Sequence, residues 1–457
     1  MGWSAREMAD FTQQQKAILA STARNNLVHA VAKTGKTTVL ARKYLNHQKR
    51  PGEAKAIFIT ANALATERVV EHLQRITALS WQEELIGTIA EIGFKLLKRY
   101  HRELAYTKPP EVVSDLSASA DRDAARKTAL EVHADQASVA FHEQWNQAFV
   151  QIMRRKNLAT PRSLTIEAIN LLTKVIQPEL AGVRLLLADN VHDFGLEEML
   201  ALSTLQARMG QTFLSGNLNL AIYDRLQDLD PEHWLTLVHQ DGIKSHPLTQ
   251  LFGVGKAQGL FVQQLAAYNS KRVYETALTF GTDPASQMLV EVTVATREQM
   301  LQVILDMEAQ LQLGIRRRLL AVILRNPDDT REMARNLKRP CFLQWDKNRL
   351  WHRTDVPTQG IVCTTPFEAP YLNPDYVVLP NCLNGYWPYQ RERNAENCRR
   401  AFLRAVSSAR NGIFFLIPDP SHALLPSPFL AEGCTPKLVT KAVTLKLGEK
   451  GATLAAK

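Results

Sequence analysis

Residues 30–37 read AVAKTGKT and lie between an apolar run and a stretch with helical periodicity. In a phosphate-binding loop, a glycine permits a tight turn and backbone N–H groups at a helix N-terminus cradle the phosphates. A lysine reaches the β- and γ-phosphates, and a Ser or Thr hydroxyl binds Mg²⁺. Gly35, Lys36 and Thr37 stand at these positions, whereas Ala30 replaces the usual first glycine. The segment predicts a nucleotide site in an α/β domain; the alternative is a surface turn that happens to contain Gly-Lys-Thr.

Such a loop needs an acidic side chain at the end of a second buried strand to hold the metal through water. Residues 185–193, LLLADNVHD, supply Asp189 at that position. The next residue is Asn190, where a hydrolysing enzyme uses a carboxylate to orient or deprotonate the attacking water. Because an amide cannot act as a base, the sequence predicts nucleotide binding with impaired hydrolysis.

Short apolar runs predict the buried strands of parallel sheets. They fall at residues 27–32, 56–60, 183–188, 212–215, 288–294, 319–324, 376–379 and 413–417. Residues 102–182 are polar, Ala-rich and without such runs, which indicates a helical insertion. The pattern predicts two α/β units with a junction within residues 240–260.

The chain carries 55 Lys and Arg against 45 Asp and Glu, a formal net charge of +10. This excess favours polyanionic partners such as nucleic acid. The longest strongly apolar stretch, residues 412–418, is far shorter than the roughly 18 residues that a membrane span needs. The five cysteines form no CxxC pair, so neither a disulfide framework nor a zinc site is supported. We expect a cytoplasmic protein without a membrane partner.

The order of motifs resembles that of the UvrD/Rep family of superfamily 1 DNA helicases, over most of residues 11–110, 183–260 and 285–430. FTQQQKAIL resembles the family's Q motif, AVAKTGKT its motif I, DNVHD its motif II and SGNLNLAIY its motif III. LTQLFGV is similar to motif IV, TPFEAPYLNPDYVVLP to motif V and RRAFLRAVSSAR to motif VI.

The resemblance implies an α/β fold of two RecA-like P-loop domains with parallel sheets and a small helical insertion in the first. ATP and Mg²⁺ would lie between the domains, and single-stranded or partly duplex DNA would cross their top. Residues 1–101 and 183–240 would form the first domain, 102–182 the insertion, 241–430 the second domain and 431–457 a basic tail.

The resemblance also implies which residues bind each ligand. ATP would contact Gln15, Ala32, Lys33, Thr34, Gly35, Lys36, Thr37, Thr38 and Phe252; Mg²⁺ would contact Thr37 and Asp189; and DNA would contact Thr60, Asn62, Tyr223 and Trp387. Gln15 would read the adenine edge, and Phe252 would stack on the adenine ring. Packing in the core or at its rim is the alternative for Tyr223 and Trp387.

The sequence departs from the family pattern where the family does chemistry. Asn190 replaces the catalytic Glu, and Asn373 replaces a Glu that would hold the ribose. Gly253 and Ser408 replace two arginines that would touch the γ-phosphate. Loss of a general base costs roughly 10²–10⁴ in rate, and loss of an arginine finger roughly 10³–10⁵. Nearby candidates for a replacement finger are Arg399, Arg400, Arg404 and Arg410.

The retained binding groups and replaced catalytic groups together predict an ATP- and DNA-binding protein with weak or absent hydrolysis. Such a protein would serve as a regulatory, non-catalytic subunit of a DNA-processing complex, beside a nuclease or helicase partner. The alternative is an active, divergent ATP-dependent DNA helicase or translocase.

Overall fold

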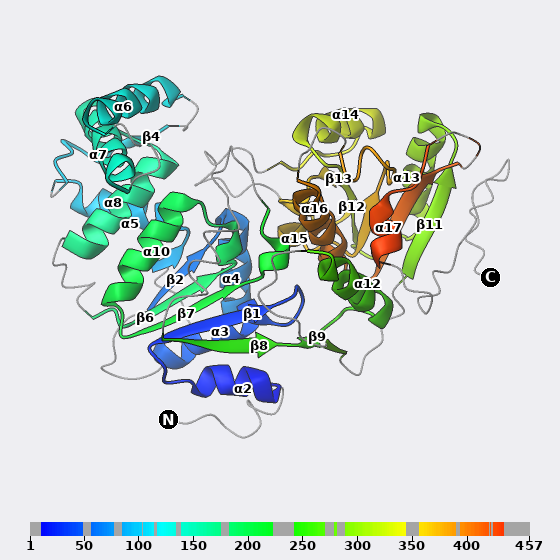
Figure 1. Cartoon of the computed structure of the whole chain (residues 1–457), viewed down its shortest axis with the longest axis horizontal. Coiled ribbons are helices and arrows are strands. Elements are labelled where there is room, and N and C mark those ends of the chain that lie inside the picture. The colour runs from blue at the N-terminus through cyan, green and yellow to red at the C-terminus, as the bar shows by residue number, and fades with distance from the viewer. Residues whose placement is uncertain are drawn as a thin grey trace.

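The computed structural model describes residues 11–48, 56–76, 85–102, 104–113, 117–133, 139–174, 182–222, 242–269, 278–280, 288–343, 356–389, 394–419, 421 and 424–433. These residues form two α/β lobes side by side, with a group of helices projecting from the first (Figure 1). No helix within these ranges is long and apolar enough to cross a membrane.

The first lobe is built on a six-stranded parallel sheet with the order β3-β2-β6-β7-β1-β8. Its strands are β1 (Asn25–Ala30), β2 (Ala56–Thr60), β3 (Ile86–Gly87), β6 (Leu185–Asp189), β7 (Gln211–Gly216) and β8 (Ile243–Leu248). The sequence predicted β2 with identical bounds and β1, β6 and β7 with small shifts. It did not predict β3 or β8.

Strand β8 corrects the expected start of the second domain at residue 241. Its six residues pair with β1 from Asn25 to Ala30, so they belong to the first sheet. The sequence IKSHPL exposes the consecutive residues Lys244 and Ser245 and contains Pro247, as an edge strand can. The junction between the lobes therefore follows residue 248, within the 240–260 interval that the apolar pattern predicted.

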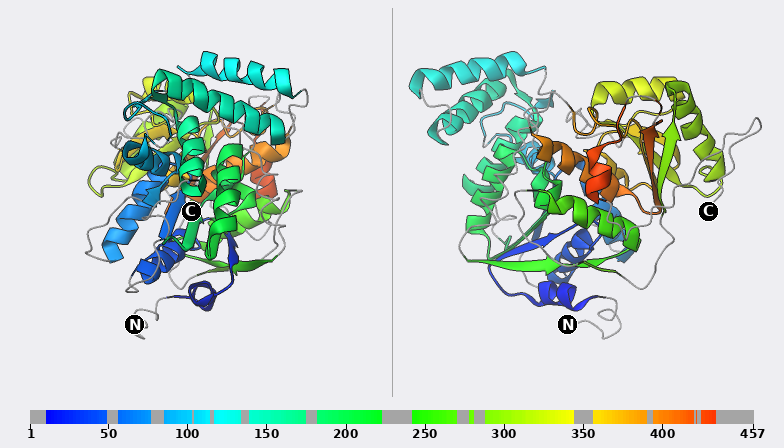
Figure 2. Two further views of the ribbon diagram at one scale, coloured as in Figure 1. Left: turned by 90° about the vertical axis from the view of Figure 1, so that its left-hand side faces the viewer. Right: turned by 45° about the vertical axis from the view of Figure 1, so that its right-hand side comes forward.

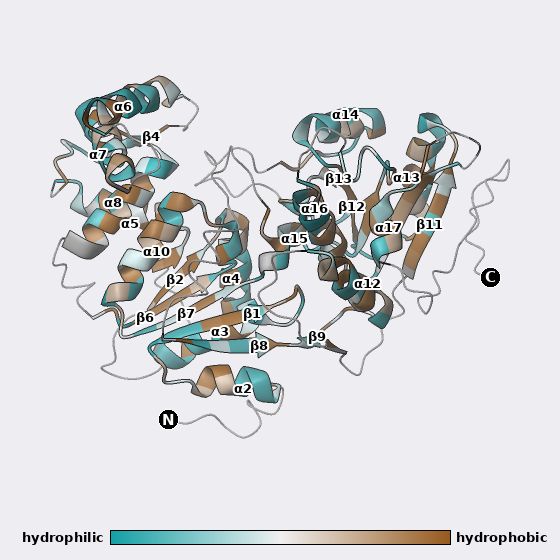
Figure 3. Cartoon of the chain, in the orientation of Figure 1, coloured by the Kyte–Doolittle hydropathy of each residue, from teal (hydrophilic) through white to brown (hydrophobic). Residues whose placement is uncertain are grey.

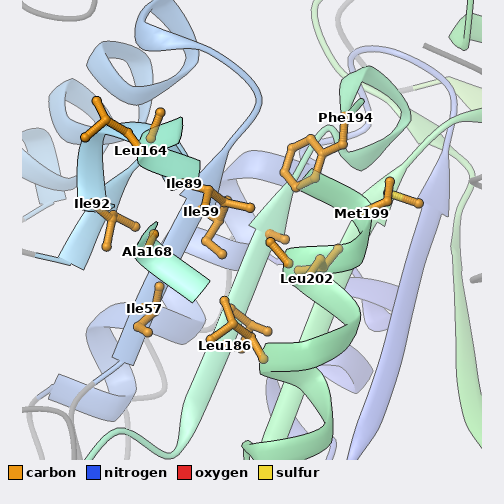
Figure 4. Packing of buried hydrophobic residues seen from close by; sticks show 14 of the residues in the cluster. Ile57, Ile59, Ile89, Ile92, Leu164, Ala168, Leu186, Phe194, Met199 and Leu202 are labelled. Carbon is orange, nitrogen blue, oxygen red and sulfur yellow. The ribbon is translucent and has the colours of Figure 1, made fainter. Parts of the chain in front are cut away.

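Helices cover both faces of the first sheet. The helices α2 (Gln13–Ala20), α3 (Lys36–Gln48) and α4 (Ala63–Ile76) pack with one apolar cluster, and α5 (Ile89–Tyr100) and α10 (Leu196–Arg208) with another. Figure 4 shows this second cluster, in which Ile57, Ile59 and Leu186 from the strands meet Ile89 and Leu202 from the helices. In Figure 3 much of the inner part of this sheet is brown, whereas the edge strand β8 is largely teal.

The region expected to be a helical insertion contains α6 (Ser119–Val132), α7 (Val139–Lys156) and α8 (Pro161–Lys174). It also holds a two-stranded parallel pair, β4 (Glu111–Val112) and β5 (Leu158–Ala159). Helices α6 and α7 project from the lobe (Figure 2). Helix α8 instead packs against α5 and contributes Leu164, Ala168 and Leu171 to the core beside the sheet.

The second lobe is a five-stranded parallel sheet with the order β11-β15-β14-β12-β13. Its strands are β11 (Met288–Val294), β12 (Leu319–Ile323), β13 (Gly360–Thr364), β14 (Tyr376–Leu379) and β15 (Gly412–Pro418). Helices α13 (Arg297–Gln310) and α14 (Pro327–Leu337) pack in one cluster, and α12 (Lys256–Ala267), α16 (Ala395–Ser408) and α17 (Pro428–Gly433) in the other.

The fold-class prediction is confirmed, because two lobes with parallel sheets and helices on both faces are what two RecA-like domains require. A short pair, β9 (Gln250–Leu251) with β10 (Thr279–Phe280), lies just beyond the junction. Only residues 431–433 of the expected basic tail lie within the described part of the chain, where they end α17.

Candidate nucleotide site

The loop between β1 and α3 has the backbone of a phosphate cradle. Gly35 adopts a positive φ of 81°, and a β-carbon at this position would lie 2.7 Å from the Gln15 side-chain nitrogen. Within the loop, the Thr34 hydroxyl donates to the carbonyl of Val31 at 3.0 Å. The turn therefore favours glycine, and a β-carbon here would also displace the end of the Gln15 side chain.

Lys36 begins α3 and folds its side chain back over the loop. Its ammonium nitrogen donates to the carbonyls of Ala30 and Val31 at 3.1 and 2.8 Å. Burial lowers the pKa of Lys36 to about 8, and Asp189 opposes this shift. The cation thus donates to backbone carbonyls of the loop, at the position from which it would meet a phosphate.

Two residues from distant parts of the chain reach the loop. The buried side chain of Gln15 closes a capping box on α2 and donates to the carbonyl of Thr34 at 3.3 Å. The backbone N–H of Phe252, which follows β9, donates to the carbonyl of Lys33 at 2.8 Å. The Phe252 ring remains 39% exposed. The structure brings both residues to the loop, and their contacts with adenine remain predictions.

Asp189 ends β6 beside the first turn of α3. One of its carboxylate oxygens accepts a hydrogen bond from the Thr37 hydroxyl at 2.5 Å, and the other accepts one from the Ser215 hydroxyl. A hydroxyl and a carboxylate in contact fit Mg²⁺, which usually takes few protein ligands and completes its shell with water and phosphate. The described residues contain no cluster of three or more His, Cys, Asp or Glu side chains that would form a separate metal site.

The remaining loop residues predicted to bind ATP lie around this cradle. Ala32 is half-buried and packs against the apolar cluster of the second lobe. Thr38 lies in the first turn of α3 and is also half-buried.

Lys33 connects the loop to the second lobe. Its ammonium group donates to the side-chain oxygen of Asn373, which follows α15 (Ala369–Leu372). Burial, together with the nearby charges of Arg410 and Arg68, lowers the pKa of Lys33 to about 7, and Asp375 opposes this shift. Sequence reasoning included Lys33 in the site and noted Asn373 as a departure, but it did not predict that they touch.

A buried ion pair forms a second connection between the lobes. Arg404 on α16 pairs through two nitrogens with Asp193, in the 3-10 turn Val191–Asp193 after β6. The Tyr371 hydroxyl also donates to Asp193. Burial raises the pKa of Asp193, but Arg404, His192 and Tyr371 outweigh it, so the net pKa is lowered. Nothing in the sequence reveals this pairing between residues 211 positions apart.

Asn190, Gly253 and Ser408, at the positions expected to hold a catalytic Glu and two arginines, supply no base and no cation. Asn190 follows Asp189 in a left-handed conformation with φ of 57°. Ser408 is buried and donates to the carbonyl of Ala405, while Gly253 has no side chain. Three of the candidate replacement arginines have acidic partners, which are Glu432 for Arg399, Glu396 for Arg400 and Asp193 for Arg404.

Three of the four residues predicted to contact DNA lie in the described part of the chain, and two of these three are buried. Thr60 is buried and bonds to the Thr66 hydroxyl, while Asn62 accepts from the N–H of Ala65 at the start of α4. The prediction that Trp387 contacts DNA is wrong, because Trp387 is fully buried. Its ring packs edge to face on Phe402, with the ring centroids 5.4 Å apart. No base can stack on a ring in that environment. Tyr223 lies outside the described residues.

The fold and the loop together define a helicase-type, nucleotide-binding protein. Residues 11–237 match the family model described as UvrD/REP helicase N-terminal domain. Through this half the chain belongs to the UvrD/Rep-like helicase family, as the order of motifs predicted.

Comparison with curated proteins finds no match. Among solved structures, S. cerevisiae Dbp5 bound to RNA and ADP BeF3 is similar, with 10% identity, a TM-score of 0.44 and coverage of 91% of this chain and 85% of that one. A substituted form of Dbp5 with the same ligands gives 9% identity, a TM-score of 0.42 and coverage of 89% and 83%.

Proposed function

We propose that this protein binds Mg²⁺ and ATP at the loop of residues 30–37, binds single-stranded or partly duplex DNA, and hydrolyses ATP weakly or not at all. It would act as a regulatory, non-catalytic subunit of a DNA-processing complex with a nuclease or helicase partner. The supporting observation is an intact phosphate cradle with the Thr37–Asp189 contact, beside an amide at position 190 where a base is needed.

Binding follows from the groups already in place. Lys36 exchanges the carbonyls of Ala30 and Val31 for phosphate oxygens, which carry a full negative charge. Thr37 and Asp189 hold Mg²⁺, which neutralises charge on the phosphates when bound. Phe252, with 39% of its surface exposed beside the loop, offers a ring for the base.

Hydrolysis lacks two contributions at once. The Asn190 side chain accepts no proton from water, and Ser408 points its hydroxyl into its own helix rather than offering a charge. An arginine at position 408 would also have to enter a buried environment, since only 2% of Ser408 is exposed. These two losses are not additive, but either one is large enough to prevent useful turnover.

The second candidate is an active, divergent ATP-dependent DNA helicase or translocase. The retained contact between Thr37 and Asp189, together with Lys36 at the head of α3, favours it. This candidate requires a base and a cation from residues that the family does not use for these purposes.

DNA binding is supported by the family and by the net charge of +10. A protein held by phosphate contacts loses affinity steeply as salt rises, because binding releases condensed counterions. Fluorescence anisotropy with a labelled oligonucleotide should therefore show salt-sensitive binding of single strands. Equal affinity at low and high salt would contradict this part of the proposal.

Nucleotide binding is tested by titrating the full chain with ATP and Mg²⁺ in a calorimeter. We expect binding by the wild type, loss of binding in Lys36→Ala, and weaker binding in Phe252→Ala, because the base loses its stacking surface. Base–aromatic stacking contributes about 1–3 kcal/mol. Absence of binding by the wild type would refute the nucleotide site.

A further inference from the structure

Lys33 has a backbone conformation that its residue type disfavours. Its φ is 64°, in the left-handed region where a β-carbon crowds the following carbonyl. The backbone is held there from outside the loop, because the Lys33 carbonyl accepts the N–H of Phe252 at 2.8 Å. Strained residues persist only where their surroundings fix them, and they cluster at ligand clamps and switch regions.

The side chain of Lys33 crosses from the loop to a neutral partner. Its acceptor, the amide oxygen of Asn373, belongs to a residue that is also left-handed, with φ of 51°. Asn373 is the C-cap residue of α15, and its backbone N–H donates to the Ala369 carbonyl at 3.3 Å. Residues in the left-handed conformation therefore stand on both sides of this contact.

The surroundings of Lys33 are predominantly cationic. Arg68 donates to the carbonyls of Tyr371 and Leu372 and forms an exposed ion pair with Glu71 at 3.6 Å, and both Arg68 and Arg410 act on Lys33 as like charges. Asp375 is the acidic group that acts on Lys33 in the opposite sense. Such a concentration of positive charge around a neutral acceptor attracts an anion.

Two arginines on α16 near the interface have acidic partners. Arg404 pairs with Asp193 at the interface, and Arg400 pairs with Glu396 at 2.6 Å. Lys33 instead donates to an uncharged amide, although it belongs to the same loop as Lys36, the proposed phosphate ligand. An incoming phosphate would offer Lys33 a stronger, fully charged acceptor.

We infer that Lys33 is a sensor of the terminal phosphate. In a bound nucleoside triphosphate, that phosphate replaces the Asn373 amide as the acceptor of the Lys33 ammonium. Lys33 therefore distinguishes triphosphate from diphosphate, and the exchange of partners removes the Lys33–Asn373 contact between the loop and the second lobe. The inference rests on the proposed nucleotide site and adds its ligand specificity.

The test compares the affinities of a non-hydrolysable ATP analogue and of ADP, each with Mg²⁺, for four full-length variants. Lys33→Met removes the charge, and Lys33→Gly removes it while relieving the left-handed strain. Asn373→Ala removes the competing acceptor. Lys244→Met removes one charge from an exposed position on β8 and serves as the matched control.

We expect both Lys33 variants to lose about tenfold to hundredfold in affinity for the triphosphate analogue, as for loss of one charged hydrogen bond. Their affinity for ADP should change little. Asn373→Ala should bind the analogue more tightly than the wild type, because Lys33 no longer has to leave a partner. Lys244→Met should match the wild type with both nucleotides.

Equal losses for the analogue and ADP in the Lys33 variants would overturn the inference, since Lys33 would then only shape the loop. Unchanged affinity in these variants, or weaker analogue binding by Asn373→Ala, would also overturn it. If the wild type binds both nucleotides and Lys36→Ala binds neither, the proposed site stands whatever the Lys33 result. If the wild type binds neither nucleotide, the proposed site and the inference both fail.

Discussion

Replacing Arg404 with Met should destabilise the protein by about 3–5 kcal/mol, the usual cost of removing one partner from a buried ion pair. The side chains of Arg404 and Asp193 are only 2% and 9% exposed, so water cannot replace the guanidinium. In the variant, the Asp193 carboxylate would still accept the hydrogen bond from the Tyr371 hydroxyl. The charge on Asp193 would then be buried without a counterion.

The assay is urea unfolding of the full chain, followed by circular dichroism. Arg297→Met is the matched control, because the Arg297–Glu332 pair has side chains 52% and 50% exposed. Such exposed pairs contribute about 0–1 kcal/mol. Adding Asp193→Asn to Arg404→Met should recover part of the loss, since the buried charge is gone.

The effect should also depend on pH in a defined direction. The pKa of Asp193 lies below its usual 3.8, so the stabilisation by Arg404 is present above pH 3.8 and is lost as pH falls through the lowered pKa. The reasoning is refuted if Arg404→Met costs no more than Arg297→Met at pH 7. It is also refuted if the double variant is no more stable than Arg404→Met.

Two further predictions concern stability. In Gly93→Ala the new β-carbon would lie 2.3 Å from the Leu164 carbonyl oxygen, so thermal melting should show a loss of about 1–3 kcal/mol in the free energy of unfolding. Gly314→Ala, whose β-carbon would have no atom within 4 Å, is the control and should be nearly neutral. Equal effects of the two substitutions would contradict this packing. Burial lowers the pKa of His29 and of His192 from 6.5 to about 4, so each unfolded histidine takes up its proton first and stability falls as pH drops from 6.5 to 4. The loss is on the order of 3 kcal/mol for each histidine, and urea unfolding at pH 7 and 4.5 that gives equal stability would contradict it.

The strands that the sequence predicts best are those in which a continuous apolar run is buried on both faces. β2 and β14 were predicted with identical bounds for this reason, and β11 was predicted with identical bounds although it is an edge strand that exposes Thr293. β8 was missed because it lies at the sheet edge and exposes Lys244 and Ser245. β13 was missed because its five residues, GIVCT, contain too short an apolar run to stand out from its neighbours.

The candidate site likewise contains features that the sequence predicts and contacts that it does not. The loop of residues 30–37 is predictable because its chemistry depends on consecutive residues, and Asp189 because it ends a recognisable strand. The contacts of Lys33 with Asn373 and of Arg404 with Asp193 join residues that no local pattern relates. Trp387 shows the converse problem, since an aromatic residue in a motif region has the same sequence signal whether it faces a base or the core.

The central proposal is that the protein binds ATP and hydrolyses it weakly or not at all. Its most direct test is phosphate release by the purified full-length protein, with saturating ATP and Mg²⁺, in the presence and absence of single-stranded DNA and beside Lys36→Ala. We expect slow or undetectable release that single-stranded DNA does not stimulate, from a wild type that binds ATP. Release that rises with single-stranded DNA and disappears in Lys36→Ala would contradict it and identify an active motor.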